Sequence, residues 1–227
     1  MILAPFATSV VHTLAMPPEL IAFSGVAAVL VVTPGPDMAL VARNALVGGR
    51  AAVPVTVLGI CAGIVVHAMA AAIGLSALLQ ASATAYAVVK VAGGVYLIYL
   101  GVQAWRASLS REGEGEWMLG PARRFAGGSA FRQGFVSNVL NPKLVVFFIS
   151  VLPGFTSPDD PFFAQVVVLA AAFELLTVLW LFTYGTAVAR IGDAMRSPRV
   201  RHLLERISGT VLIALGLKIA VDGAREL

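Results

Sequence analysis

Two ionisable residues follow proline-containing interruptions in otherwise apolar stretches of the chain. Asp37 comes directly after Thr-Pro-Gly-Pro at 33–36, and Lys143 comes directly after Asn141 and Pro142. A proline inside a helix removes a backbone hydrogen bond and clashes with the preceding turn, so each interruption predicts a broken helix. In a membrane, backbone groups freed in this way are tolerated only inside protein or beside a wet cavity. The paired interruptions therefore predict a polar binding site within a membrane-spanning bundle.

The residue types at the two breaks suit a small zwitterionic substrate. Half-helix N-termini present partial positive charge and free N–H groups, which could hold a carboxylate together with Lys143. Asp37 could hold an ammonium group or carry a coupling proton. The simpler alternative is a pair of kinked helices in which Asp37 is a first-turn dipole residue and Lys143 is its buried partner. We favour the functional interpretation, because ionisable groups at membrane depth are usually functional.

Several neighbours of these charges are expected to shape the site. Pro36 and Pro142 fit the first position of a new half-helix, and Asn141 is a suitable cap for the second one. Gly35 is expected to permit a backbone path that other residues resist. Asn138 lies three residues before Asn141, on the same helix face, and could line the cavity. The predicted substrate-binding residues are Pro34, Gly35, Pro36, Asp37, Asn138, Asn141, Pro142 and Lys143.

Three residues are candidates for proton coupling: Asp37, His67 and Glu174. Histidine gains and loses a proton near neutral pH, so His67 could relay one, or it could satisfy a helix-packing contact. Glu174 could contact substrate or a proton, or it could hydrogen bond to a neighbouring helix. The single cysteine, Cys61, cannot form an internal disulfide and is interpreted as a small core hydrophobe. No metal site and no cofactor is predicted.

These residues belong to a chain whose composition is that of a polytopic membrane protein. Hydrophobic residues make up 59% of it and charged residues only 12%, whereas a soluble domain is about a quarter charged. Its mean hydropathy is +0.89. Apolar runs long enough to cross a hydrocarbon core of about 30 Å occur at about 18–42, 51–79, 85–106, 131–153, 161–189 and 203–222. The predicted fold is all-α, with six transmembrane helices of which the first and fourth are broken.

The distribution of basic residues predicts the orientation. Arginines are concentrated after the first, third and fifth spans, which places those loops in the cytoplasm and both termini on the periplasmic or extracellular side. The net charge of +4 is then mostly a topology signal, and nucleic-acid binding is not expected. Residues 1–16 lack the basic start of a signal peptide and are predicted to be an N-terminal extension, with Met16 as an alternative start to Met1.

The chain is predicted to consist of two three-helix repeats. The first covers 17–107 and the second covers 131–227, joined by a Gly- and Glu-rich cytoplasmic linker at 108–130. Because three spans are an odd number, the second repeat must insert upside down relative to the first, as in many secondary transporters. The two breaks would then approach each other near the middle of the membrane.

The break motifs are part of a wider set that resembles the LysE/RhtB family of amino-acid exporters, over about residues 17–220. The first break, Thr-Pro-Gly-Pro-Asp at 33–37, is followed by Arg-Asn-Ala-Leu at 43–46 and Gly-Gly-Arg at 48–50. Further matching positions are Gly59, Gly63, His67, Lys90, Gly93, Gly94, Tyr96, Leu97, Tyr99, Leu100, Gly101, Phe131, Arg132, Gly134, Asn138, Asn141, Pro142, Lys143, Trp180, Tyr184, Arg206, Ser208 and Gly209. Glu174 is not part of this pattern.

This resemblance implies a secondary exporter of amino acids or close derivatives in the bacterial inner membrane, driven by the proton gradient. We expect alternating access, in which Asp37 and Lys143 form or exchange a charge pair. A neutral or hydroxylated amino acid is favoured over lysine, because Lys143 and the half-helix termini make the site no more than mildly acidic. Close-packing glycines and the resemblance allow a homodimer.

Two alternatives are a metal-ion exporter on a related scaffold and, from another class, an intramembrane enzyme or electron carrier. A divalent metal-ion exporter on a related scaffold would need several carboxylate, cysteine or histidine side chains at helical spacing, and the spans offer only Asp37, Glu174 and His67. An intramembrane enzyme would need a cluster of acid, base and arginine near one face, which the spans lack, so catalysis is not expected. The predicted partners are a zwitterionic substrate, protons and the lipid bilayer.

Overall fold

The computed structural model describes residues 17–109, 129–156, 161–195 and 198–227, and the described elements are all helical. The N-terminal extension predicted at 1–16 and most of the linker predicted at 108–130 lie outside these residues. The elements are α2 (Pro17–Val32), α3 (Pro36–Gly48), α4 (Ala52–Ala81), α5 (Ala83–Ala107), α7 (Ala130–Val139), α8 (Pro142–Val146), the π-helical turn η1 (Phe147–Val151), the 3-10 turn η2 (Leu152–Phe155), α9 (Phe162–Met195) and α10 (Pro198–Arg225).

Both predicted helix breaks are confirmed. A bend of 54° separates α2 from α3, and a bend of 49° separates α7 from the segment that starts with α8 and ends at Phe155. In each case the new helix begins with a proline at its first position, Pro36 or Pro142. A proline there cannot donate a hydrogen bond to the preceding turn, so the earlier helix ends and the next one starts at an angle.

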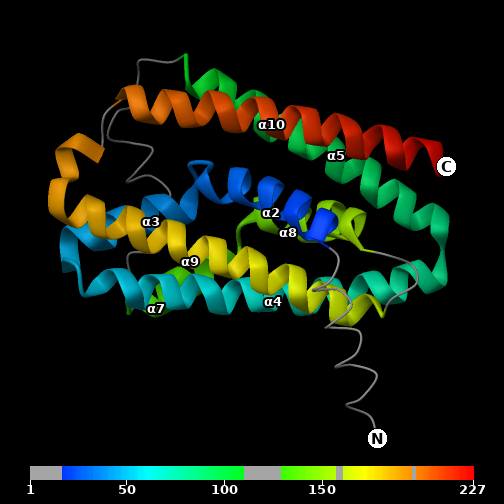
Figure 1. The fold of residues 1–227 in the computed structure, drawn as a ribbon, viewed down its shortest axis with the longest axis horizontal. Coiled ribbons are helices and arrows are strands. Elements are labelled where there is room, and N and C mark those ends of the chain that lie inside the picture. Colours follow the sequence, from blue (N-terminus) through cyan, green and yellow to red (C-terminus); the bar gives the residue numbers. More distant parts are fainter. Residues whose placement is uncertain (1–16, 110–128, 157–160, 196–197) are drawn as a thin grey trace, which may run out of the picture.

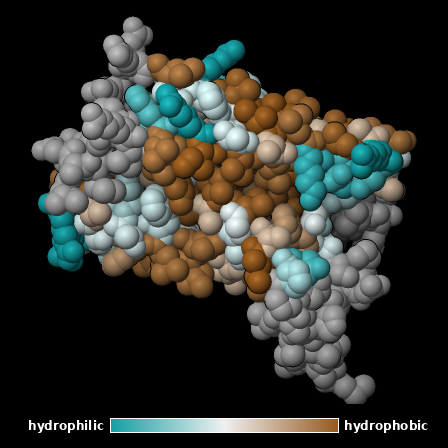
Figure 2. Space-filling model, turned by 45° about the horizontal axis from the view of Figure 1, so that its top comes forward, coloured by the Kyte–Doolittle hydropathy of each residue, from teal (hydrophilic) through white to brown (hydrophobic). Residues whose placement is uncertain are grey.

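Among the described residues, four long helices are apolar and long enough to span a membrane, and counting each of the two bent pairs as one span gives up to six. Figure 1 shows that the first span, α2 with α3, runs from right to left and that each later span reverses direction. The fourth span therefore runs opposite to the first, the fifth opposite to the second and the sixth opposite to the third. Figure 2 shows an apolar band across the middle of one face, with hydrophilic residues at both ends. This is the surface of a multi-pass membrane protein.

The third and sixth spans, α5 and α10, lie along each other (Figure 1), and glycines of the two helices face each other at their contact. A Cβ atom on Gly209 would lie 2.7 Å from the carbonyl oxygen of Gly101, and one on Gly216 would lie 2.5 Å from that of Gly94. No real side chain tolerates such distances, so the two backbones can approach this closely only because these positions lack side chains. Later residues of α5 face earlier residues of α10, which makes the pair antiparallel.

The glycines predicted to allow close helix packing in the second span do so within the chain. A Cβ atom on Gly59 would lie 2.1 Å from the carbonyl oxygen of Phe131, and one on Gly63 would lie 2.6 Å from the side-chain oxygen of Asn138. Both partners belong to the fourth span. These two glycines are therefore occupied inside the protein and give no support to a homodimer, which stays a prediction.

Helices extend further than the apolar runs in the second half of the chain. α9 continues to Met195 and α10 starts at Pro198, so Arg190 lies on a helix rather than in the predicted loop. Arg43, also expected in a loop, lies inside α3 and donates to the side-chain oxygen of Gln133 at 3.4 Å. Hydropathy marks where the chain leaves the hydrocarbon, whereas helical hydrogen bonding continues beyond it, and this explains why α9 extends past its apolar run.

Candidate functional site

At the first break Pro34 leaves the carbonyl of Leu30 without its helical donor, and the side chain of Lys143 supplies a replacement. In a continuous helix the carbonyl of Leu30 would accept a hydrogen bond from the N–H of residue 34, but Pro34 has none. Instead, the Lys143 ammonium donates to the carbonyl oxygen of Leu30 at 3.2 Å and to that of Thr33 at 3.3 Å. The carboxyl end of α2 also attracts a cation through its helix dipole. A side chain from the second half of the chain thus completes the break in the first half.

The second break contains the same defect, repaired by a histidine. Pro142 cannot donate to the carbonyl of Asn138, which lies four residues earlier. That carbonyl oxygen lies 3.0 Å from Nε2 of His67 and accepts from the N–H of Asn141 at 2.9 Å. A carbonyl oxygen can only accept, so His67 must carry a hydrogen on Nε2. The structure therefore places His67 at the second break, buried at 7% exposure.

Asp37, at the start of α3, is held entirely by side chains of the second break. The hydroxyl of Ser137 donates to Oδ1 at 3.0 Å, and the amides of Asn138 and Asn141 donate to Oδ2 at 2.9 and 3.2 Å. An ionised carboxylate is an acceptor only, so three donors match its hydrogen-bonding capacity. Hydrogen bonds to a charged group are among the stronger ones.

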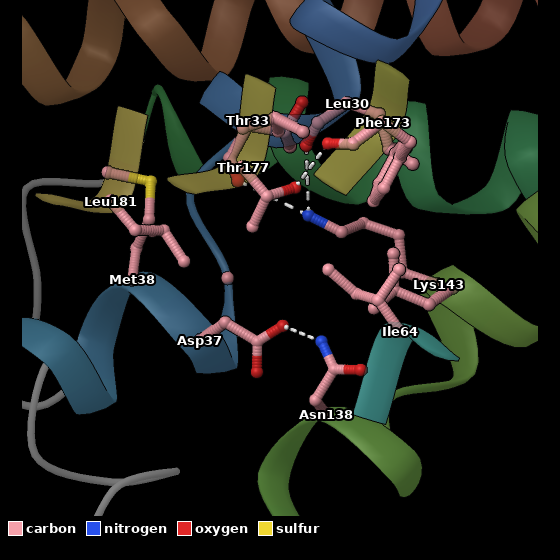
Figure 3. A pocket seen from close by; sticks show the side chains of 13 residues that line it. Leu30, Thr33, Asp37, Met38, Ile64, Asn138, Lys143, Phe173, Thr177 and Leu181 are labelled. Carbon is pink, nitrogen blue, oxygen red and sulfur yellow. Dashed lines mark hydrogen bonds between the residues drawn. The ribbon is translucent and has the colours of Figure 1, made fainter. Parts of the chain in front are cut away.

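Each charged residue is thus hydrogen bonded to the break in the other half of the chain: Asp37 to the second break and Lys143 to the first. This is called here the crossed arrangement. In the described part of the chain no ion pair within 4.0 Å joins Asp37 to Lys143. The direct pair considered from the sequence is not formed in this conformation. Instead, the two groups face one space from opposite sides, the ammonium turned toward Leu30 and Thr33 and the carboxylate turned toward Asn138 (Figure 3).

The space between the charges, called here the inner cavity, has a volume of about 30 Å³. This is room for roughly two water molecules, since one buried water needs at least about 10–15 Å³. It is too small for an amino acid, so this conformation is closed around the two charges. Its lining comes from both halves of the chain: Leu30, Val31, Thr33, Gly35, Asp37, Met38, Ile64, Asn138, Lys143, Leu144, Phe173, Thr177 and Leu181.

A second and much larger space lies on the other side of the breaks. This outer cavity, of about 440 Å³, separates the breaks from α5 and α10. Its volume is within the range of about 300–1,000 Å³ that is typical of small-molecule sites. Thr33, Gly35 and Lys143 line both cavities, so they form the partition between them. The full lining is Thr33, Pro34, Gly35, Pro36, Tyr96, Tyr99, Leu100, Gln103, Ala104, Ala107, Asn141, Pro142, Lys143, Glu205 and Leu212.

All eight residues predicted to bind substrate line one or both of these cavities. Asp37 and Asn138 line the inner cavity alone. Pro34, Pro36, Asn141 and Pro142 line the outer cavity, and Gly35 and Lys143 line both. Binding itself is not tested by this placement, but the structure brings the two interruptions together as expected.

Two expectations about the N-termini of the half-helices need adjustment: that Gly35 is needed for the backbone path, and that the N–H groups are free to bind substrate. Gly35 has φ −170° and ψ −172°, an extended conformation open to any residue, so its backbone path is not one that requires glycine. Asn141 caps the second half-helix as predicted, accepting from the N–H of Lys143 at 3.1 Å. Because this N–H is already occupied, a substrate could bind it only by displacing Asn141. The N-terminus of α3, capped by Gly35, has no such side-chain cap.

Glu174 lies outside both cavities, although its neighbours Phe173 and Thr177 line the inner one. Its carboxylate is hydrogen bonded to the thiol of Cys61 on α4, which is one of the two arrangements that the sequence left open. Cys61 itself is buried at 6% exposure, as expected for a small core residue.

Sequence reasoning missed several residues of the site. Ser137 was not singled out, although a polar residue beside Asn138 in an apolar span was a visible signal. Tyr96, Tyr99 and Gln103 were not recognised as cavity-lining either, and their spacing of three and four residues indicates one face of a helix. Pro34 implies that the Leu30 carbonyl lacks a helical donor, but the sequence does not show that Lys143 donates to this carbonyl and to that of Thr33.

Comparison with known proteins decides the family. The model described as LysE type translocator matches residues 28–223, a range that includes both breaks. The chain belongs to the LysE type translocator family. No solved structure matches it.

Relatives of this LysE-type translocator cover most of its length. The uncharacterized membrane protein YrhP of Bacillus subtilis is 30% identical over 209 residues, which is 90% of this chain and 99% of the relative. The threonine efflux protein of Escherichia coli K12 is 27% identical over 198 residues, 86% of this chain and 93% of the relative. The homoserine/homoserine lactone efflux protein of Salmonella typhi is 27% identical over 165 residues, which is 73% of this chain and 78% of the relative.

These similarities agree with the resemblance noted from the motifs. They place the chain among multi-pass membrane transporters whose named relatives carry out amino-acid efflux. They do not favour the metal-ion alternative, and the described residues contain no group of three or more His, Cys, Asp or Glu side chains placed to hold a metal.

Proposed function

We propose that this translocator exports small neutral or hydroxylated amino acids across the bacterial inner membrane by alternating access coupled to the proton gradient. The observation that carries the proposal is the crossed arrangement of Asp37 and Lys143. Each charge of a zwitterion matches one of these groups. A substrate carboxylate would replace the carbonyls of the first break as the acceptor for Lys143. A substrate ammonium would replace the amides of the second break as the donor to Asp37.

The crossed bonds also suit a moving transporter. They join one half of the chain to the other at the breaks, so any rocking of one half against the other must break them. An unpartnered charge in a membrane protein interior is costly, and a zwitterion that supplies both missing partners lowers that cost. The opposite directions of the equivalent spans support an inverted repeat, and by the positive-inside rule both termini would lie on the periplasmic side.

Proton coupling is assigned to Asp37, because its surroundings depend on its charge. All three of its partners donate to it in this conformation. A protonated carboxyl group has an O–H donor of its own and accepts less strongly, so the three donors would no longer match it. Protonation from the outside would therefore weaken the hold of the second break on α3 and allow the empty transporter to reset.

The substrate class rests on the relatives and on the size of the outer cavity. Threonine and homoserine appear in the names of the efflux relatives. The outer cavity is large enough for such molecules and has one cation at the partition. It lies where α5 ends and α10 begins, which is the end of the bundle that the arginines assign to the cytoplasm.

Efflux from proteoliposomes tests this function. Vesicles loaded with radiolabelled threonine are diluted into a buffer that imposes a pH gradient, and release is followed with time. Asp37→Asn should reduce gradient-driven release by about tenfold or more, because it removes the charge from a group with charge-assisted hydrogen bonds. Asp222→Asn, the same change near the far end of α10, is the matched control and should behave as wild type.

Two results would count against the proposal. Full gradient-driven release by Asp37→Asn would remove the coupling role of this carboxylate. A wild-type protein that releases none of a panel of neutral, hydroxylated and basic amino acids would remove the transport function itself.

A further inference from the structure

One face of α5 carries polar side chains toward the breaks at membrane depth. Tyr96, Tyr99 and Gln103 all line the outer cavity, and the same face continues to Ala107. From Tyr96 to Ala107 this face covers about 16 Å of helix at 1.5 Å per residue. Polar groups inside a membrane span generally face the bundle interior or a water-filled cavity. The outer cavity is therefore an elongated space that leads from the breaks to the end of α5, with a row of polar side chains along an otherwise largely apolar wall.

Charged groups of opposite sign lie at its two ends. Lys143 is at the partition, next to the breaks. Glu205, on α10, is buried at 5% exposure and also lines the cavity. Because Gly209 faces Gly101 and Glu205 is one turn earlier on the antiparallel helix, Glu205 lies nearer the end of α5. A zwitterion would find a cation at the inner end and a carboxylate at the outer end.

Tyr99 and Gln103 present a hydrogen-bonding pair that suits an alcohol. The amide nitrogen of Gln103 donates to the hydroxyl oxygen of Tyr99. That bond leaves the O–H of Tyr99 as a donor and the side-chain oxygen of Gln103 as an acceptor, and both residues are exposed to the cavity. A substrate hydroxyl is itself one donor and an acceptor, so it could bond to both groups at once.

We propose that the outer cavity is a substrate site in which Tyr99 and Gln103 recognise the hydroxyl group of the exported amino acid. This inference rests on the proposed function and adds the residues that set its specificity. The substrate carboxylate faces Lys143, and the ammonium lies between Glu205 and the ring faces of Tyr96 and Tyr99, which attract cations. From this site, movement of Lys143 away from Leu30 and Thr33 opens the partition to the inner cavity.

Labelling of an introduced cysteine tests whether the cavity is a wet substrate site. The one native cysteine, Cys61, is buried, so a cysteine introduced at Gln103 or Ala107 is the reactive one. A membrane-impermeant maleimide should label either position in inside-out vesicles. Threonine at about ten times the Kd measured for the Gln103→Cys variant should slow its labelling about tenfold, because only the empty site reacts. Val95→Cys is on a face of α5 outside the cavity and should stay unlabelled.

Competing substrates that differ by one hydroxyl test the recognition itself. Threonine and valine have the same shape, but valine has a methyl group in place of the hydroxyl. Gln103→Leu and Tyr99→Phe should each raise the KM for threonine about 2- to 10-fold, the value of a typical hydrogen bond, with little effect on valine. Val95→Leu should change neither KM.

The possible outcomes distinguish a failure of this inference from a failure of the proposed export function. If wild type exports threonine while both α5 variants keep its threonine-to-valine preference, the specificity role is wrong and export stands. If threonine gives no protection against labelling in a protein that transports it, the cavity is not a substrate site. If wild type exports no amino acid, the proposed function fails first.

Discussion

His67 donates a hydrogen bond across 3.0 Å to the main-chain carbonyl of Asn138, the carbonyl that Pro142 leaves without a helical donor. The first break has the same arrangement, with the Lys143 ammonium donating to Leu30. Two proline breaks are therefore repaired in the same way, each by a side chain from a separate element. The second repair is linked to Asp37, since the side chain of Asn138 donates to its carboxylate, and Lys143 of the first repair lines the same inner cavity as Asp37.

Removing the donor of His67 should weaken the second break. In His67→Leu the Asn138 carbonyl keeps only its bond from Asn141, and the lost buried hydrogen bond costs about 1–3 kcal/mol. The apparent melting temperature in detergent should fall by several degrees. His67→Gln restores a donor and should recover most of the loss. It also separates the two roles of His67, because a proton relay would lose gradient-driven export in His67→Gln, whereas a structural donor would keep it.

Restoring the missing donor at the first break should straighten the helix and stop transport. Pro34→Ala supplies an N–H that can bond to the Leu30 carbonyl, in competition with Lys143. A proline costs up to about 3 kcal/mol in a helix interior, so stability should be equal or higher while export falls.

The control for this variant is Pro54→Ala, in the first turn of α4. The N–H of that position has no partner within the helix, so both stability and export should be unchanged. Normal export by Pro34→Ala would show that the first break is not needed for transport.

A methyl group at Gly63 should disturb Asp37 from a distance. In Gly63→Ala the new Cβ would lie 2.6 Å from the Asn138 side-chain oxygen, and Asn138 is fully buried and cannot move aside freely. We expect a loss of about 1–3 kcal/mol, typical of overpacking, together with reduced export. Gly74→Ala is the control on the same helix, because nothing lies within 4 Å of its Cβ. Equal melting temperatures for the two variants would contradict a close contact between Gly63 and the side chain of Asn138.

The facing glycines of α5 and α10 should be sensitive to added volume. A Cβ on Gly209 would lie 2.7 Å from the Gly101 carbonyl oxygen, so Gly209→Ala forces the two backbones apart. The expected loss is about 1–3 kcal/mol in thermal unfolding. Gly101→Ala combined with Gly209→Ala should cost less than the sum of the two, because both push apart the same contact. Additive losses would place the two residues in separate contacts; Gly25→Ala, with nothing within 4 Å, is the neutral control.

The sequence by itself determined where the helices break and what kind of protein this is. Proline removes a backbone donor wherever it stands, so the ends of α2 and α7 follow from local chemistry at Pro34, Pro36 and Pro142. The long apolar runs determine membrane insertion in the same local way. The limits of α9 and α10 did not follow, because hydropathy says where lipid ends and not where a helix does.

Only the tertiary structure decided which group satisfies each break. The partners of Asp37 are about a hundred residues away in the chain, and so are those of Lys143. Their identity depends on how two halves of opposite direction pack, and residue types alone are compatible with a direct Asp37–Lys143 pair. The division of the site into a small inner cavity and a large outer one likewise comes from packing, because a cavity is the volume that side chains from separate helices fail to fill.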